Sequence, residues 1–447
     1  METIAAVATP SGRGGVGIVR VSGPLAGQIA RATVGHLPVP RAAEYLAFLD
    51  TQNRVIDRGI ALYFPAPHSF TGEDILELQG HGGPVVMDLL LQQVVGLGAR
   101  IARPGEFSER AFLNGKLDLV QAEAIADLIS CNSEQALRGA LQTFHGEFSK
   151  QVGALVQRLI ELRSYVESAI DFPTDEIDFL DDERVTEKLD RIEKRLASIR
   201  QSAQQGALLR DGMQIAIVGQ PNAGKSSLIN LLARKNLAIV TEIPGTTRDA
   251  LHEQINIDGL PLHVVDTAGL RESDDVVERH GIARTLDEIQ RADHILLVVE
   301  ERAGFSKATR EIARGFPSDT SVTVIRNKID LFETVSPRFE QGELGSEIYM
   351  SAKSGDGLAL LQNHLKKCVG YNDGSEGQFM ARRRHLTLLE QAAHHLSSGR
   401  EVLSSTVAGE LLAEDLRLAQ NSLSEITGEY TPDDLLGDIF STFCIGK

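Results

Sequence analysis

Apolar side chains between positions 152 and 170 recur every three or four residues, which is the spacing of one face of an α-helix. The positions are Val152, Leu155, Val156, Leu159, Leu162, Val166, Ala169 and Ile170. A similar pattern runs from about Val185 to Gln204, and helical patterns return after residue 377 and continue to about Gly428. The pattern therefore predicts two helical segments on either side of a central region of the sequence.

The central region, residues 211–370, alternates short apolar runs with helical patterns. The runs at 215–218, 262–266 and 322–326 have the length of buried strands, whereas 227–232 is helix-like. This alternation predicts a parallel sheet covered by helices. Residues 1–115 are rich in glycine and proline, and they also alternate β-like with helical pieces.

We therefore expect a multidomain chain that combines α/β and all-α parts. An α/β domain is expected at 1–115, helical segments at 116–210 and 371–447, and a second α/β domain at 211–370. The simplest architecture packs the two helical segments into one domain, with residues 211–370 inserted between them. A length of 447 residues also suits about three domains.

Composition places the chain in an ordinary class. Hydrophobic residues make up 42% of the chain and charged residues 24%, as in soluble globular proteins. No apolar run approaches the ~18 residues of a membrane span, and the N-terminus lacks a basic segment before an apolar core. The sequence thus predicts no membrane association and a cytoplasmic location.

Cysteine and histidine spacing gives no sign of a metal or redox centre. Cys131, Cys368 and Cys444 lie far apart, and none belongs to a C-x-x-C motif. The histidines show no H-E-x-x-H or similar spacing, so a catalytic transition metal is not expected. We expect Cys131 and Cys368 to be plain core or surface residues.

Charge argues against a broad nucleic-acid surface, because 62 acidic and 45 basic side chains give a net charge of −17. An RNA partner would need a local basic patch. The run Arg382–His385 is a candidate, although a basic run on a helix is more often a solvated face.

A glycine-rich loop carries the first candidate chemistry. Residues 219–226 have the pattern G-x-x-x-x-G-K-S between a predicted strand and a predicted helix. Glycines let the backbone wrap an anion, and N–H groups at the helix start face it. Lys225 supplies a positive charge, and Ser226 offers a hydroxyl to Mg²⁺. The residues expected to bind the phosphates are Asn222, Ala223, Gly224, Lys225, Ser226 and Ser227.

Two further motifs are expected at the terminal phosphate. Gly245-Thr-Thr-Arg-Asp249 contains Thr247, which can ligate Mg²⁺, and Asp266-Thr-Ala-Gly269 closes a predicted strand. Gly269 can offer its N–H to a γ-phosphate, so the flanking segments would order with the triphosphate and relax after hydrolysis.

Two last motifs predict recognition of the base. Asp330 ends Asn327-Lys328-Ile-Asp330 and can accept hydrogen bonds from the ring N–H and the exocyclic amine of guanine, a donor pair that adenine lacks. Ser351-Ala352-Lys353 follows another predicted strand and would close over the base. Five motifs in this order predict a site for GTP and GDP with Mg²⁺.

With these motifs and this layout, the chain resembles the MnmE (TrmE) family of tRNA-modifying GTPases from end to end. The resemblance rests on Ile4–Pro10 with Gly12–Gly17, Phe70–Asp74, Gly80–Gly83, Arg103–Phe107, Lys116–Asp118 with Gln121–Ile125, and Cys444-Ile-Gly-Lys447. It implies an N-terminal dimerising domain similar to folate-dependent aminomethyltransferases, a discontinuous helical domain and an inserted P-loop GTPase domain.

The resemblance also implies a reaction and its partners. A homodimer would work with MnmG, an FAD enzyme, to add an aminomethyl or carboxymethylaminomethyl group at carbon 5 of the wobble uridine of certain tRNAs. The carbon would come from a tetrahydrofolate derivative such as 5-formyltetrahydrofolate. The resemblance implies that this folate is held by Arg20, Glu77, Lys116 and Lys447. Without the resemblance, the plainer interpretation of each residue is a surface ion pair. Cys444 matches a cysteine that the family needs for modification.

The expected hydrolysis differs from that of Ras-type GTPases, which place a glutamine after D-x-x-G to orient the attacking water. This chain has Leu270 there, and the resemblance points to Glu278 instead. The extra positive charge that the transition state needs has two possible sources. One is an arginine, Arg248 or Arg271. The other is K⁺, which by resemblance would be bound by Asn222, Thr241, Ile243 and Thr246.

Some alternatives stay open. Asn222 follows Pro221 and is also a typical turn residue. The main competing function is a GTPase switch of the ribosome-assembly type, without a catalytic role in modification. Another is a one-carbon transferase that the GTPase domain regulates.

Overall fold

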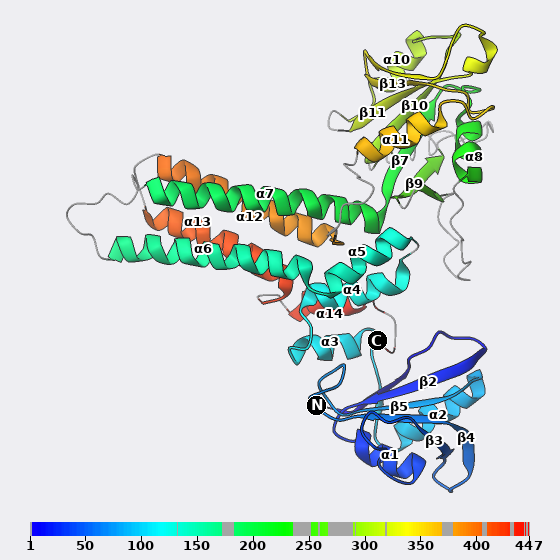
Figure 1. The fold of residues 1–447 in the computed structure, drawn as a ribbon, viewed down its shortest axis with the longest axis vertical. Coiled ribbons are helices and arrows are strands. Elements are labelled where there is room, and N and C mark those ends of the chain that lie inside the picture. Colours follow the sequence, from blue (N-terminus) through cyan, green and yellow to red (C-terminus); the bar gives the residue numbers. More distant parts are fainter. Residues whose placement is uncertain are drawn as a thin grey trace, which may run out of the picture. The chain divides into compact units, whose positions relative to one another are not determined.

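The computed structural model describes residues 2–131, 133–171, 183–235, 252–257, 260–266, 289–290, 292–317, 320–368, 379–404, 409–429, 433–441, 443 and 446. It divides into two compact units (Figure 1). The first comprises Met1–Ile129, Thr143–Leu196 and Leu388–Lys447, and the second comprises Ser130–Gln142 and Ala197–Thr387.

The N-terminal part of the first unit is a six-stranded sheet with the order β3-β4-β5-β2-β1-β6. Its strands are β1 (Ile4–Val7), β2 (Gly14–Ser22), β3 (Glu44–Leu49), β4 (Val55–Phe64), β5 (Ile75–Gly82) and β6 (Arg100–Ile101). Neighbours pair antiparallel except β1 and β6. Helices α1 (Ala26–Val34) and α2 (Pro84–Gly96) bury apolar side chains against the sheet (Figure 1). The alternation predicted for 1–115 is confirmed.

Helices that are distant in sequence pack together in the rest of the first unit. Its helices are α3 (Glu106–Leu113), α4 (Leu119–Ser130), α6 (Glu147–Asp171), α13 (Gly409–Thr427) and α14 (Asp433–Ser441). Helix α13 packs along α6, where Arg163 donates to Oε1 of Gln420 at 2.7 Å. The helix predicted from the apolar pattern at 152–170 is confirmed, and Val152, Leu159 and Val166 are buried.

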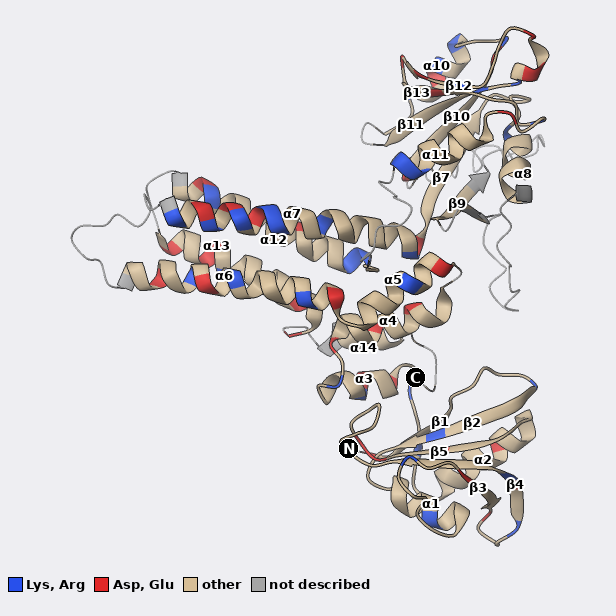
Figure 2. Cartoon of the chain, viewed as in Figure 1, with Lys and Arg blue, Asp and Glu red and all other residues tan. Residues whose placement is uncertain are grey.

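Helices α5 (Glu134–Phe144), α7 (Glu183–Asp211) and α12 (Arg383–Ser404) each have residues in both units. Within the first unit, Arg400 of α12 pairs with Glu193 of α7 at 2.6 Å and also with Asp190. The helix predicted at 185–204 is confirmed and extends further in both directions. Acidic and basic side chains alternate along α7, as on a solvated face (Figure 2).

The second unit contains a seven-stranded sheet with the order β12-β13-β11-β10-β7-β9-β8. Its strands are β7 (Met213–Gly219), β8 (His252–Ile257), β9 (Leu260–Asp266), β10 (His294–Glu300), β11 (Ser321–Asn327), β12 (Arg338–Gly342) and β13 (Gly345–Tyr349). Helices α8 (Lys225–Lys235), α10 (Lys307–Ala313) and α11 (Leu358–Cys368) accompany it, with a 3₁₀ turn at Ile329–Leu331.

The five inner strands of this sheet are parallel, as predicted, but the edge strands β8 and β12 pair antiparallel. Each edge strand is joined to its neighbour by two residues, and so short a connection allows only an antiparallel hairpin. Strand β10 is buried from His294 to Val299, because helices cover both faces of the sheet. The sheet therefore provides a rigid edge at which the loops after β7, β10, β11 and β13 can meet.

Among the described residues, no helix combines the length and the apolar character that crossing a membrane requires.

Candidate functional site

The glycine-rich loop links the end of β7 to the start of α8, as its sequence predicts. Its two motif glycines lie against neighbouring strands. A Cβ on Gly219 would lie 2.3 Å from the backbone oxygen of Val298. Gly224 has a φ of +99°, and a Cβ there would lie 2.1 Å from Nδ2 of Asn327. Only glycine fits at these positions without moving the loop.

Lys225 lies inside this loop and carries its positive charge. Its Nζ donates to the carbonyl oxygens of Gly219 at 2.8 Å and Gln220 at 3.0 Å. Ser226 and Ser227 are exposed in the first turn of α8, and Ala223 is buried. The Lys225 ammonium and the N–H groups at the helix start are donors, and the exposed Ser226 can offer its hydroxyl to a metal ion. One loop therefore carries both kinds of group.

Asn222 is exposed and has a φ of +63°, which is left-handed backbone that asparagine tolerates better than most residues. This geometry matches the turn residue of the plainer interpretation. It leaves the side-chain oxygen accessible to a cation, so both interpretations of Asn222 stand.

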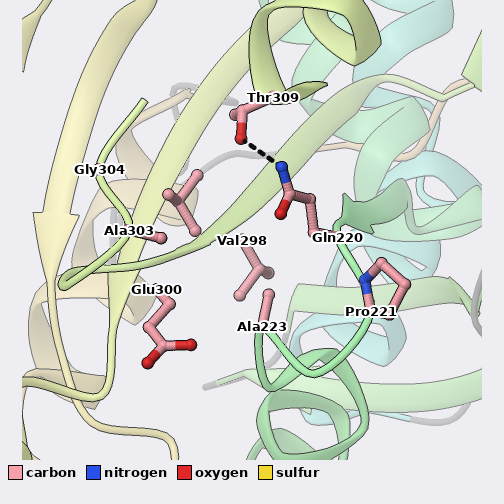
Figure 3. A pocket seen from close by; sticks show the side chains of 9 residues that line it. Gln220, Pro221, Ala223, Val298, Glu300, Ala303, Gly304 and Thr309 are labelled. Atoms are coloured by element: carbon pink, nitrogen blue, oxygen red, sulfur yellow. Dashed lines mark hydrogen bonds between the residues drawn. The ribbon is translucent and has the colours of Figure 1, made fainter. Parts of the chain in front are cut away.

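A small cavity of about 40 Å³ lies between the loop and the end of β10 (Figure 3). Gln220 lines it and donates from Nε2 to Ser306 Oγ at 2.6 Å and Thr309 Oγ1 at 3.2 Å. The volume suits a few water molecules and not a purine. Gln220 thus anchors the outer side of the loop to α10, a role that its variable position in the sequence motif does not indicate.

Asn327, at the end of β11, joins the phosphate loop to the segment 351–353. Its Nδ2 donates to the backbone oxygen of Ala223 at 2.8 Å, and its Oδ1 accepts from the N–H of Ala352 at 2.9 Å. The Asn327 side chain is buried, with 2% of the residue exposed. Asn327 therefore fixes the spacing between the loop expected at the phosphates and the segment expected at the base.

Asp330 is exposed in the 3₁₀ turn, where a ligand can reach it. Ser351 donates from Oγ to Oδ1 of Asp330 at 2.6 Å, and Ser351 itself is fully buried. Lys353 is exposed in the same segment, while Lys328 pairs with Glu300 at 2.8 Å. The structure thus brings Asp330 and Ser351 together beside Asn327, at the sheet edge that the sequence predicts.

Asp266 ends β9, and its backbone pairs in register with Ile217, two residues before the glycine-rich loop. The remaining residues predicted at the phosphates and for catalysis lie outside the described residues. They are Thr241, Ile243, Thr246, Thr247, Arg248, Gly269, Arg271 and Glu278, and Leu270, which is not expected to act in catalysis, also lies outside the described residues.

In the N-terminal sheet, Arg20 and Glu77 face each other on β2 and β5. Nε of Arg20 donates to Oε1 of Glu77 at 2.9 Å, so the ion pair of the plainer interpretation is present. The guanidinium lies 5.9 Å from the Phe70 ring and 5.8 Å from the Phe107 ring. It also donates to the backbone oxygen of Gly446 at 3.2 Å. The C-terminal motif therefore contacts Arg20, while Cys444 and Lys447 themselves lie outside the described residues.

Lys116 donates from Nζ to the backbone oxygen of Pro67 at 3.1 Å and lines an open hollow of about 390 Å³. The motif residues that follow it form the start of α4. The N–H of Asp118 donates to Oε1 of Gln121 at 3.0 Å, and the N–H of Gln121 donates to Oδ1 of Asp118 at 2.8 Å. This is a capping box, so that part of the motif has a structural explanation. Burial raises the pKa of Asp118, although the N–H of Gln121 opposes the rise.

The segment Arg103–Phe107 begins α3 and contains a buried carboxylate, Glu106, whose side chain is 3% exposed. Glu106 accepts from NH2 of Arg100 at 2.7 Å, from the N–H of Arg103 at 2.8 Å and from NH2 of Arg110 at 3.1 Å. Burial would raise the pKa of Glu106, but these donors outweigh it and lower the pKa to about 2. Glu106 thus ties β6 to α3.

The basic run Arg382–His385 is the candidate RNA patch that the sequence offers. His385 is buried and its Nδ1 accepts from the N–H of Arg382 at 3.0 Å, while Arg382 and Arg384 are only partly exposed. Of these three arginines, Arg383 alone is exposed. The run therefore belongs to the packed start of α12.

Solved structures resemble this chain weakly. Era of Aquifex aeolicus bound to GDP·AlF₄⁻ has a TM-score of 0.27 and 25% identity, covering 41% of this chain and 66% of that chain. The G domain of the FeoB iron transporter of T. maritima has a TM-score of 0.26 and 21% identity, covering 35% and 98%. With TM-scores this low, these similarities assign neither a fold nor a function to this chain.

Sequence comparisons are much stronger. The model of the GTP-binding protein TrmE N-terminus matches residues 3–116, and that of the MnmE helical domain matches residues 119–444. The tRNA modification GTPase MnmE of Sodalis glossinidius is 58% identical over all of this chain and 99% of the relative. That of Haemophilus influenzae strain 86-028NP is 57% identical over the full length of both. The chain therefore belongs to the MnmE family of tRNA modification GTPases.

Proposed function

We propose that GTP hydrolysis by this chain is stimulated by K⁺ and serves the modification of wobble uridines in tRNA together with MnmG. In this proposal a homodimer of the chain and the FAD protein MnmG add an aminomethyl or carboxymethylaminomethyl group at carbon 5, in the cytoplasm. A tetrahydrofolate derivative such as 5-formyltetrahydrofolate supplies the carbon. The observation that carries the nucleotide part is the linkage through Asn327 of the phosphate loop to the segment beside Asp330.

The proposed nucleotide contacts follow from this arrangement. Lys225 and the N–H groups at the start of α8 bind the phosphates, and Asp330 accepts from guanine beneath Ser351–Lys353. Ser226, exposed in the first turn of α8, and Thr247 would hold Mg²⁺, which neutralises phosphate charge. Calorimetry of GTP and ATP tests base recognition. Equal affinity for the two nucleotides would contradict the role of Asp330.

The proposed K⁺ site contains hard oxygen ligands, as a hard cation requires. The exposed side chain of Asn222 suits such a role, and the carbonyl oxygens of Thr241 and Ile243 with Thr246 would complete the set. K⁺ would supply the positive charge that an arginine finger supplies elsewhere. We expect fast hydrolysis in K⁺ and slow hydrolysis in Na⁺, with Asn222→Ala losing the difference. Equal turnover in both salts would assign the charge to an arginine such as Arg271.

Glu278 is proposed to position the attacking water, because Leu270 has no group that can do so. Glu278→Ala should then abolish hydrolysis while the dissociation constant of GTP stays nearly unchanged, since the interaction is made only in the transition state. Glu278→Gln tests whether the charge is needed. A large loss of GTP binding in either variant would show that Glu278 is structural.

The folate proposal rests on Arg20, Glu77, Lys116 and Lys447, with Cys444 acting nearby in modification. The convergence of Arg20, Glu77 and the Gly446 backbone supports it, because cations suit the glutamate tail of folate and a carboxylate suits the pterin N–H groups. Calorimetry with 5-formyltetrahydrofolate should show weaker binding in Glu77→Gln and Lys116→Ala. Arg54→Ala, which changes an arginine that is 72% exposed in the same domain, is the matched control.

The modification itself is tested by analysing wobble uridines in cells that lack this gene. We expect those uridines to lack the carbon 5 substituent, and the wild-type gene to restore it. Unaltered uridines would favour the alternative, a GTPase switch in ribosome assembly, and would leave the nucleotide site in place.

A further inference from the structure

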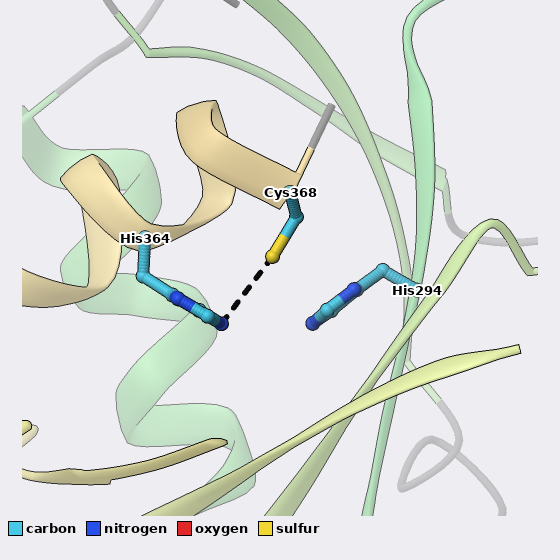
Figure 4. Close-up of side chains that lie close together, drawn as sticks. All are labelled: His294, His364 and Cys368. Carbon is cyan, nitrogen blue, oxygen red and sulfur yellow. Dashed lines mark hydrogen bonds between the residues drawn. The ribbon is translucent and has the colours of Figure 1, made fainter. Parts of the chain in front are cut away.

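Three side chains with metal-binding atoms converge in the second unit, away from the residues discussed so far (Figure 4). His294 is the first residue of β10, whereas His364 and Cys368 lie one turn apart at the end of α11. Their ligand atoms all lie within 4.8 Å of one another. Sγ of Cys368 is 3.3 Å from Nε2 of His364.

Hydrogen bonding alone explains this arrangement poorly. Oγ1 of Thr323 lies 2.8 Å from Nε2 of His294 and 2.8 Å from Nε2 of His364. Nε2 of His364 therefore has two close neighbours, Oγ1 of Thr323 and Sγ of Cys368. A neutral imidazole nitrogen carries either one hydrogen or one lone pair, so it cannot make two separate well-directed bonds. One of these two contacts is therefore not explained by a well-directed hydrogen bond.

The chemistry of the three atoms is specific. Two imidazole nitrogens and one thiolate are ligands that Zn²⁺ prefers, whereas Mg²⁺ and K⁺ prefer oxygen. An imidazole nitrogen that carries no hydrogen has a lone pair to offer to such an ion.

The cluster is distinct from the nucleotide site. Strand β10 begins at His294 and ends at Glu300, which lines the small cavity beside the glycine-rich loop. A strand of this length spans about 20 Å. The end of α11 returns to the edge where β10 begins, opposite the edge that carries Asn327 and Asp330.

We propose that His294, His364 and Cys368 form a binding site for Zn²⁺ or a similar borderline transition-metal ion. The ion would bind both Nε2 atoms and Sγ, while the Cys368 thiol releases its proton to solvent and the Thr323 hydroxyl turns away. A water molecule would complete a tetrahedral set. Such an ion would cross-link β10 to the last turn of α11.

Co²⁺ is the probe for the ligand set, because tetrahedral Co²⁺ absorbs visible light and a thiolate adds a charge-transfer band in the near ultraviolet. We expect one such site in the full-length protein with excess Mg²⁺ and GDP present. Cys368→Ser and His364→Ala should each weaken Co²⁺ binding about 100-fold or more, since changes outside the ligand set alone cost 10–100-fold. Cys131→Ser is the matched control and should bind as the wild type does.

Alkylation of the unaltered protein gives an independent test that does not depend on how a variant folds. Zn²⁺ should slow the reaction of Cys368 with iodoacetamide, measured by peptide mass spectrometry, and should leave Cys131 unaffected. The proposal is overturned if Cys368 reacts equally fast with and without Zn²⁺. A Co²⁺ spectrum with its thiolate band intact in Cys368→Ser would overturn it as well.

Discussion

Replacing Glu106 with glutamine should reveal how strongly this buried carboxylate stabilises the N-terminal domain. Glutamine keeps the size of the side chain but removes the negative charge that Arg100 and Arg110 share. Its amide hydrogens would also face N–H donors where the carboxylate offered acceptors. Removing one partner of a buried, hydrogen-bonded ion pair is among the more costly single changes.

The magnitude follows from the pKa of Glu106. The pKa is about 2 in the folded protein, against an ordinary value of 4.5. Each pH unit between the two values is worth about 1.4 kcal/mol, so the ionised carboxylate stabilises the fold by about 3 kcal/mol at pH 7. Because the folded pKa is the lower one, this stability is present above pH 4.5 and is lost as the pH falls toward 2. At pH 3 roughly half of it remains.

The assay is urea denaturation of the full chain at pH 7 and pH 3, followed by hydrogen exchange of the segment 100–113. Glu106→Gln should lower the local free energy of unfolding by about 3 kcal/mol at pH 7 and by about half of that at pH 3. Glu109→Gln is the control. Glu109 lies on the same helix and pairs with Arg103 at 2.9 Å, but the side chain of Arg103 is 65% exposed. Equal losses in the two variants, or a loss that does not shrink at pH 3, would refute the reasoning.

Three further predictions concern other parts of the chain. Asp330→Asn should weaken GTP binding about 100-fold, because a charged acceptor of two hydrogen bonds is lost. The same variant should bind xanthosine triphosphate more tightly than the wild type does, and calorimetry with both nucleotides measures the two affinities. Gly224→Ala should weaken GDP binding more than tenfold, or by about 1.4 kcal/mol, because the new Cβ would clash with the Asn327 amide that holds the phosphate loop. An unchanged affinity for GDP would show that the loop shifts at little cost. Asp118→Ala should lower the free energy of unfolding, measured by urea denaturation, by about 1 kcal/mol, because the cap of α4 is lost. Asp118→Ser should recover most of this loss, and neither variant should change the rate of GTP hydrolysis.

Much of the fold could be predicted from the sequence because local patterns determine it. The periodicity at 152–170 and the apolar runs before each nucleotide motif identify helices and strands that the structure confirms. The motif residues Asn327, Asp330 and Ser351 could be placed near one another because the carboxyl ends of parallel strands share one edge. Their individual bonds could not be predicted, since the link from Asn327 to Ala223 depends on side-chain conformation.

The cluster of His294, His364 and Cys368 shows where such prediction stops. His364 and Cys368 are four residues apart, which is a helical spacing, but His294 lies 70 positions away on a strand. Sequence motifs for metal sites require close spacing, so a ligand set assembled by the sheet leaves no local signal. The expectation that Cys368 is a plain residue followed from that lack of signal.

The structure separates the motif residues that hold the fold together from those that remain candidates for ligand binding. Glu106, Asp118 and Gln121 belong to segments that identify the family, yet in the structure they bind neighbouring protein groups. Their contacts explain why these residue types are needed without any ligand. Arg20 and Glu77 differ, because their ion pair meets a backbone segment from the far end of the chain.

The contact between Arg20 and Gly446 joins residues 426 positions apart. Ribosomes make proteins from the N-terminus, so the sheet that carries Arg20 is made before Gly446, which is added only after hundreds of further residues. Gly446 also has a φ of +95°, and any side chain there would meet the Val7 backbone oxygen at 2.6 Å. Gly446 is thus translated hundreds of residues after the sheet that it contacts, and only the smallest amino acid fits at its position.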